Sequence, residues 1–195
     1  MTVDRVSLGG RLRQLRKQRR WTLNDVSART GLAVSTISKT ERGEMSLTYD
    51  KFMRLAQGLG LDVNELFSPS GRSFSAGSHA ITRFGDEKSY ETENYVYDML
   101  CAELRHKHMV PMHGRIKAHH IREFKEIVSH PGEEFVYVLS GVLTVHLEGR
   151  EAMDLTPGDS IYFDSGLGHA YVSAGKEDAE MLVVTWQPEG IDGTP

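Results

Sequence analysis

The stretch GLAVSTISKTERG, residues 31–43, decides how the first third of the chain folds. A glycine stands at either end, and glycine commonly follows a helix because it adopts left-handed backbone angles without strain. A helix that begins near Ala33, with about 100° between successive residues, has two different faces. We expect a buried face made of Val34, Ile37, Thr40 and Glu41. The opposite face carries short hydroxyls and cations, those of Ser35, Lys39 and Arg42.

The residues on both sides of this stretch also predict short helices. Apolar side chains recur at helical spacing from Leu8 to Phe67, which is typical of about four or five short helices. Thr22, three residues before Asp25, predicts a capping box at the start of one of them. Helix ends are expected at the glycines, Gly31, Gly43 and Gly60.

The exposed face of the 31–43 helix suits a nucleic acid. A DNA major groove about 12 Å wide admits one helix, and hydroxyls and cations reach base edges and phosphates there. The preceding helix would add outward cations for phosphate contacts, those of Arg13, Lys17 and Arg20. The plainer alternative is a small helical domain whose cationic face is only solvated.

The first third resembles the helix-turn-helix domain of the phage-repressor-like (XRE) transcriptional regulators. The likeness covers GGRLRQLRKQRRWTLNDVSARTGLAVSTISKTERG (9–43) and FMRLAQGLGLDVNELF (52–67). It implies a recognition helix at Val34–Glu41 that reads double-stranded DNA. The residues it places nearest the DNA are Ser35, Thr36, Ser38 and Lys39 at the bases, and Arg42 nearer phosphate.

The same resemblance implies a structural pair between Glu41 and Arg16. The sequence departs from the family pattern at two positions. Ala33 stands where a capping Ser is usual, and Thr40 stands where an Ile is usual. Both changes weaken the helix slightly and leave its reading face intact.

Charge divides the chain into two parts. Residues 1–67 hold 12 Lys and Arg against 7 Asp and Glu, a net charge of +5. Residues 68–195 hold 11 against 20, a net charge of −9. All nine histidines lie between His79 and His169. A polyanion such as DNA would therefore meet the first part, and histidine chemistry is confined to the second.

The composition of the 195-residue chain excludes several classes of protein. Cys101 is the only cysteine, which excludes an intrachain disulfide and a cysteine-rich zinc module. No apolar run of about 18 residues is present, and residues 1–10 lack the apolar core of a signal peptide. We expect a cytoplasmic protein that does not enter a membrane.

A change of pattern after Phe67 predicts a second domain. The Ser- and Gly-rich segment SPSGRSFSAGS, residues 68–78, predicts a linker. Beyond it, period-two runs predict strands at 95–100, 134–139, 142–147, 160–163, 169–173 and 181–186. We expect an α + β protein of two domains: an all-α domain over 1–67, a linker over 68–79, and an all-β sandwich or barrel over 80–195.

Three residues of the second domain are candidate metal ligands. His130 and Glu134 are four apart across a Pro-Gly turn, and His169 belongs to a distant strand. Two imidazoles and one carboxylate form a set that holds divalent iron or another transition metal with open positions. The alternative is that the histidines make only structural hydrogen bonds and that Glu134 is solvated.

The stretches SHPGEEFVYVLSGVLTVHLEG (129–149) and PGDSIYFDSGLGHAYVS (157–173) resemble the two motifs of cupins, over most of 90–187. The resemblance implies a double-stranded β-helix, or jelly-roll barrel. The full cupin metal pattern has one more histidine, and Val128 stands in its place. The resemblance therefore implies three ligands for a divalent metal such as Fe, Zn or Ni, with a reduced expectation of catalysis.

Other residues of the second domain suit a ligand or the core. His113, Arg115 and Lys117 alternate, and inside the barrel they would favour an acidic effector such as a carboxylate, although alternation leaves the inner face open. The aromatic residues expected mainly to pack are Tyr137, Tyr162, Tyr171 and Trp186. Cys101 is expected to be a small buried side chain.

The combination of these two domains resembles bacterial transcriptional regulators in which the barrel senses a small molecule. It implies a homodimer whose two recognition helices read half-sites about 34 Å apart. Two alternatives remain. The chain is a metal-dependent cupin dioxygenase or isomerase that carries a DNA-binding domain, or its barrel only dimerises the protein and binds nothing.

Overall fold

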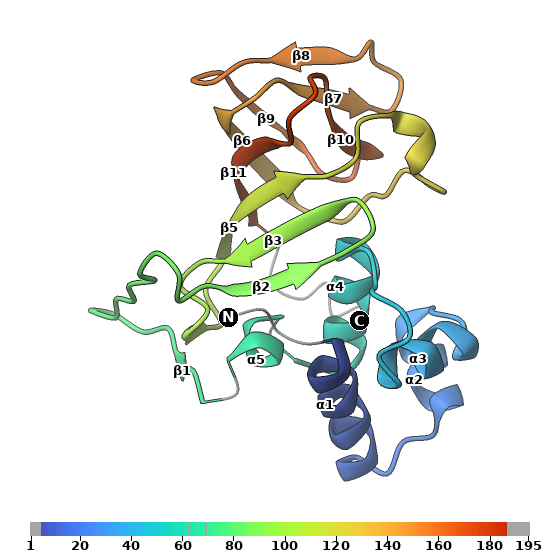
Figure 1. Cartoon of the computed structure of the whole chain (residues 1–195). Helices are drawn as coiled ribbons and strands as arrows, with labels where there is room; N and C mark the ends of the chain where they lie inside the picture. The colour runs from blue at the N-terminus through green and yellow to red at the C-terminus, as the bar shows by residue number, and fades with distance from the viewer. Residues whose placement is uncertain (1–4, 62, 69, 187–195) are drawn as a thin grey trace, which may run out of the picture. The chain divides into compact units, whose positions relative to one another are not determined.

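Figure 1 shows a computed structural model of the chain, which describes residues 5–61, 63–68 and 70–186. The described residues form two compact units. The first comprises those of 1–92 and 101–106, and the second comprises those of 93–100 and 107–195. The first unit therefore extends past residue 67, the predicted end of the helical domain. The domain boundaries expected from the sequence, 1–67, 68–79 and 80–195, stay predictions. Within the predicted linker, β1 (Arg72–Ser73) pairs in parallel with β4 (Leu104–Arg105).

The first unit begins with short helices, as the spacing of its apolar residues predicts. They are α1 (Arg5–Gln18), α2 (Leu23–Thr30), α3 (Val34–Glu41), α4 (Tyr49–Gly58) and α5 (Val63–Phe67) (Figure 1). β2 (Lys88–Glu91) also belongs to this unit. The helices bury their apolar faces in one core, which includes Leu12, Val26, Ile37, Phe52, Leu55 and Leu59.

The ends of α2 and α3 confirm the predicted caps and breaks. The Thr22 backbone N donates to the Asp25 carboxylate at 2.7 Å, and the Asp25 backbone N donates to the Thr22 hydroxyl at 3.1 Å, which completes the capping box. Gly31 and Gly43 follow their helices with φ of 68° and 72°. Ala33, at the N-cap of α3, gives no side-chain cap.

A glycine allows α1 to approach α3 closely. A Cβ on Gly9 would lie 2.3 Å from the carbonyl oxygen of Thr40, a distance that no side chain tolerates. The close approach brings α1 to the C-terminal end of α3. It also explains Gly9, a residue that otherwise weakens a helix, whereas a Cβ on the neighbouring Gly10 would meet no atom within 4 Å.

The predicted burial of α3 is right except at Val34. Ile37, Thr40 and Glu41 are buried, whereas Val34 is 36 % exposed. A helical wheel treats every turn alike, but Val34 is the first residue of α3 and follows the exposed Ala33. The start of the helix thus lies outside the core that its later turns join.

The second unit consists of two antiparallel sheets, as the alternating sequence predicts. One sheet runs in the order β3 (Tyr95–Met99), β5 (Met109–Ile116), β11 (Ala179–Trp186), β6 (Glu133–Ser140) and β9 (Ser160–Asp164) (Figure 1). The other runs in the order β10 (His169–Ser173), β7 (Leu143–Leu147) and β8 (Met153–Leu155). A short 3-10 helix, η1, spans Ile121–Glu123.

The two sheets share a core of alternate residues. The inward side chains are almost fully buried, as those of Met112, Val136, Val138, Leu143, Val145, Met181 and Val183 show. β5 is a strand that the period-two runs do not include, because Pro111 and the polar residues His113 and Arg115 interrupt its apolar pattern. Antiparallel pairing with β11 on one side and β3 on the other holds β5 as a strand although its own sequence pattern is broken.

The structure shows which face of β5 is inner, a point that alternation leaves open for His113, Arg115 and Lys117. Along β5 the buried residues alternate with His113, which is half-buried, and Arg115, which is exposed. Both therefore point to the outer face of the sheet, and Lys117 follows the strand. The His113 Nδ1 atom lies 3.1 Å from the Asp98 carboxylate on the neighbouring strand, so this imidazole pairs with an outward acid.

Three further packing predictions are wrong. Tyr137 and Tyr162 are 39 % and 62 % exposed, because both alternate to the outer face of their sheet. Cys101 is half-buried in a turn with a φ of 53°, rather than packed in a core. Tyr171, by contrast, is buried as predicted.

Within the described residues, none of the helices has the length and apolar character that a membrane crossing needs.

Candidate functional site

The residues predicted to meet DNA lie on one side of α3. Ser35, Lys39 and Arg42 are exposed, and Thr36 and Ser38 are half-buried. Ile37 and Glu41 point to the opposite side, into the helical core. On α1, Arg13 and Lys17 are exposed. Exposed hydroxyls and cations on one side of a helix can bind a polyanion. That these residues contact DNA stays a prediction.

A buried ion pair fixes the orientation of α3 against α1. The Arg16 Nε and Nη2 atoms donate to the two Glu41 oxygens at 2.6 and 2.7 Å, and Nη1 donates to the Trp21 carbonyl at 3.0 Å. The hydrogen bond with Glu41 raises the pKa of the Arg16 guanidinium. This confirms the pair implied by the family resemblance, and it is bidentate, the strongest form of such a contact.

Arg42 makes a second, exposed pair that the sequence alone does not predict. Its Nε and Nη2 atoms donate to the Glu44 oxygens at 2.6 and 2.8 Å, and Nη1 donates to the hydroxyl of Ser38. The hydrogen bonds with Arg42 lower the pKa of Glu44. A phosphate contact by Arg42 would therefore replace Glu44, because both anions use the same guanidinium edge.

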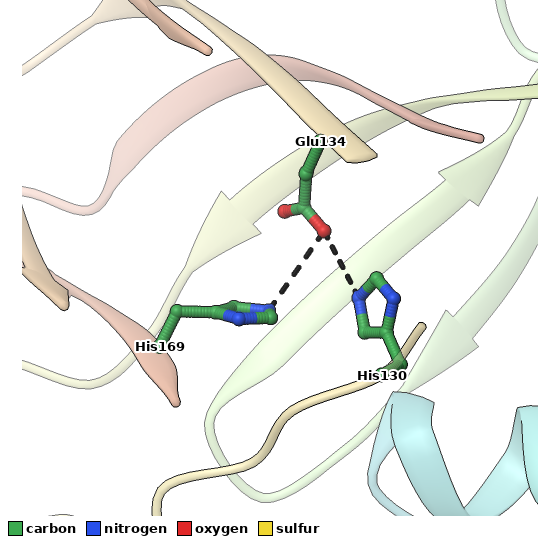
Figure 2. Close-up of side chains that lie close together, drawn as sticks. All are labelled: His130, Glu134 and His169. Carbon is green, nitrogen blue, oxygen red and sulfur yellow. Dashed lines mark hydrogen bonds and ion pairs between the residues drawn. The ribbon is translucent and has the colours of Figure 1, made fainter. Parts of the chain in front are cut away.

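The three predicted metal ligands meet inside the second unit (Figure 2). The His130 Nε2 atom lies 3.1 Å from Glu134 Oε2, and the His169 Nε2 atom lies 3.8 Å from the same oxygen. All three side chains are buried. One donor atom from each residue lies within 4.8 Å of the other two. Glu134 comes from β6 and His169 from β10, so the cluster joins the two sheets.

A backbone hydrogen bond sets the tautomer of His169. Its Nδ1 atom lies 2.8 Å from the carbonyl oxygen of Leu167. A carbonyl oxygen only accepts, so Nδ1 carries a proton and Nε2 is the ring nitrogen directed at Glu134. Phe163 packs against the same imidazole with ring centroids 5.2 Å apart. This is how a protein orients a histidine that coordinates a metal.

Tyr171 is a polar neighbour of the cluster that the packing prediction missed. Its hydroxyl donates to Glu134 Oε1 at 2.5 Å. It lies two positions after His169 on β10, and period-two alternation places both side chains on one face, which was the available signal. Burial raises the pKa of the Tyr171 phenol well above its usual range, and the neighbouring Glu134 charge raises it further.

The carboxyl group of Glu134 stays ionised although it is buried. Burial alone raises its pKa, but the His130 hydrogen bond, the two imidazoles and the Tyr171 hydrogen bond together bring the pKa below its usual value. A buried carboxylate beside two imidazole nitrogens is a strong ligand for a divalent cation.

The donor set fits a divalent transition metal. Ligands at about 2.1 Å from a metal and at right angles lie about 3 Å apart, which matches the 3.1 Å between Glu134 Oε2 and His130 Nε2. The His169 Nε2 atom, at 3.8 Å from the same oxygen, would move closer to share a metal with them. The backbone of Val128, which stands where the cupin pattern has a further histidine, bridges that of His169 beside the cluster. Three protein ligands leave further coordination positions open.

Comparisons with known proteins match the helical part and the β-sheet part of the chain to two different domain families. Residues 7–66 match a helix-turn-helix domain family, and residues 121–185 match the cupin domain family. The chain is similar to the HTH-type transcriptional regulator SutR of Escherichia coli, with 26 % identity over 85 % of this chain and 86 % of the relative. It is equally similar to the (S)-2-hydroxypropylphosphonic acid epoxidase of Streptomyces wedmorensis, with 26 % identity over 80 % of this chain and 83 % of the relative.

The fold also matches a solved structure along nearly its whole length. An HTH_3 family transcriptional regulator from Vibrio cholerae superposes with a TM-score of 0.62 at 21 % identity, over 95 % of this chain and 98 % of that one. The N-terminal helices and the C-terminal antiparallel sheets thus occur together in other proteins. The chain therefore joins an XRE-like helix-turn-helix domain to a C-terminal cupin domain.

Proposed function

We propose that the chain is a sequence-specific DNA-binding transcriptional regulator of the cytoplasm, and that it acts as a homodimer whose cupin barrel senses a small molecule. One observation carries the DNA-binding part. The hydroxyl and cationic face of α3 is exposed while the buried Arg16–Glu41 pair holds its other face. A helix fixed in this way presents its side chains to a major groove without further ordering.

Replacing Lys39 with alanine is expected to weaken binding to the operator. Each lost contact costs about 1–3 kcal/mol, and a dimer loses two. A gel-shift titration on a DNA site selected by the wild-type protein measures the change. Lys125→Ala, which removes the same charge from an exposed position of the second unit, serves as the matched control. Equal affinities of the two variants for the DNA site would show that Lys39 does not contact the DNA.

The outer face of the larger sheet supports the proposed homodimer. Tyr137, Leu139 and Tyr162 expose large apolar surface on neighbouring strands β6 and β9. Exposed apolar surface of this kind is typical of protein interfaces. A second copy of the chain is the occupant we propose, since two recognition helices related by a two-fold axis read a symmetric operator.

Leu139→Glu is expected to convert the dimer into a monomer, because the interface would bury an unpaired carboxylate. Light scattering after size exclusion measures the mass. Ala152→Glu adds the same charge beside β8 of the other sheet and is expected to leave the dimer intact. A wild-type protein that is monomeric at micromolar concentration contradicts the homodimer itself.

The chemistry of the barrel indicates how an acidic effector would bind. Among the buried polar residues of the described chain there is no Lys or Arg, so the interior offers no side-chain cation for a carboxylate. A divalent metal held by His130, Glu134 and His169 would leave a net positive charge there. We therefore propose that the effector is a small molecule whose carboxylate takes the open metal positions.

A second candidate function is metal-dependent oxidation of a small molecule. Its support is the epoxidase, which is as similar to this chain as the regulator is. Dioxygen uptake by the iron-loaded protein, measured across a set of small organic acids, separates the two. We expect effectors that shift the melting temperature without turnover. Catalytic uptake that disappears in His169→Ala would favour the enzyme.

A further inference from the structure

The two carboxylate oxygens of Glu134 have different partners, because the Tyr171 hydroxyl bonds to only one of them. Oε1 accepts the Tyr171 hydrogen bond at 2.5 Å, whereas Oε2 faces the Nε2 atoms of His130 and His169 at 3.1 and 3.8 Å. A contact of 2.5 Å from a hydroxyl to a carboxylate has the length of a charge-assisted hydrogen bond. Only one oxygen is thus directed at the two imidazoles.

We propose that Tyr171 is a positioning residue that keeps Glu134 a single-oxygen metal ligand and so keeps a coordination position open for the effector. This rests on the metal site of the proposed function. If both oxygens turned to the metal, the carboxylate would have to rotate, which would draw Oε1 away from the buried Tyr171 hydroxyl and lengthen or break their 2.5 Å hydrogen bond. That loss is costly in a buried site, so the single-oxygen arrangement is favoured.

Tyr95 in turn fixes Tyr171. The Tyr95 hydroxyl accepts a hydrogen bond from the Tyr171 backbone N at 3.0 Å and donates to the Tyr171 carbonyl at 3.3 Å. Its ring also packs near that of Tyr171, with centroids 6.4 Å apart. β10 pairs with β7 along one edge, and the Tyr95 hydroxyl satisfies the backbone of Tyr171 at the other. The chain of contacts therefore runs from Tyr95 through Tyr171 to Glu134.

The test uses cobalt(II), whose visible absorption reports its coordination, with the full-length protein. Tyr171→Phe removes the hydroxyl and keeps the ring. The matched control is Tyr90→Phe, which also removes a buried tyrosine hydrogen bond, here to the Leu47 carbonyl of the first unit. We expect about tenfold or greater loss of cobalt affinity and altered visible bands in Tyr171→Phe, with Tyr90→Phe equal to wild type.

The outcomes separate the two proposals. Wild-type affinity and bands in Tyr171→Phe would overturn the role of Tyr171 and leave the metal site standing. A wild-type protein that binds no cobalt would overturn both. If the melting curve shows that Tyr171→Phe does not fold, Tyr95→Phe decides instead, since it keeps the Tyr171 hydroxyl and loosens its strand. An affinity change in the same direction supports the proposal, and no change in affinity or bands overturns it.

Discussion

Replacing His169 with alanine is expected to abolish stoichiometric metal binding. The triad offers three donors, and removing one leaves His130 and Glu134 alone, so affinity falls by more than the roughly 10–100-fold that follows loss of an outer hydrogen-bond partner. Equilibrium titration with cobalt(II) or, without oxygen, iron(II) measures the affinity. Protein purified without an affinity tag excludes metal bound by added histidines.

His113→Ala is the matched control for this experiment. His113 also lies between two carboxylates, with Nδ1 3.1 Å from Asp98 and Nε2 3.7 Å from Glu180, but on the outer face of the sheet. If any histidine beside acids bound the metal, both variants would lose affinity. We expect only His169→Ala to do so. Equal metal content in wild type and His169→Ala would contradict the assignment of the site.

Glu41→Ala is expected to destabilise the helical domain by about 3–5 kcal/mol, because it leaves the Arg16 guanidinium partly buried without its carboxylate. The side chains of Arg16 and Glu41 are only 13 % and 7 % exposed. A loss of this size is a large share of the roughly 5–15 kcal/mol that stabilises a domain. Urea unfolding of the full-length protein, followed by helical circular dichroism, measures it.

The exposed pair of the same residue types provides the control. Arg42 and Glu44 form a bidentate contact of nearly equal length, but their side chains are 48 % and 51 % exposed. Water screens such a pair, so Glu44→Ala is expected to leave unfolding unchanged within error. Similar unfolding curves for Glu41→Ala and Glu44→Ala would mean that burial does not give the Arg16–Glu41 pair its importance.

Local sequence patterns predict most of the helices and strands, because the contacts that start and end these elements are made between residues close together in the chain. The capping box of Thr22 and Asp25 and the helix end at Gly31 depend on neighbours in the chain, and both are present. β5 depends on strands far along the sequence, since β3 and β11 flank it and its own pattern is broken by Pro111 and His113. Alternation alone also left open which side of β5 faces inward.

The candidate sites were predictable to different degrees. His130, Glu134 and His169 are specified by residue type and motif spacing, and the structure brings them together. The Tyr171 contact requires that two sheets face each other, which no local pattern encodes. Glu44, the partner of Arg42, lies past the end of α3 and outside the helical wheel that predicts the reading face.

Selection of DNA sequences from a random duplex library by the full-length protein tests the central claim most directly, namely that α3 reads DNA. We predict an enriched inverted repeat whose half-sites are about one helical turn apart, bound less tightly at higher salt. Lys39→Ala should lose the enrichment, whereas Lys125→Ala should keep it. A folded wild-type protein that enriches no sequence would contradict the account.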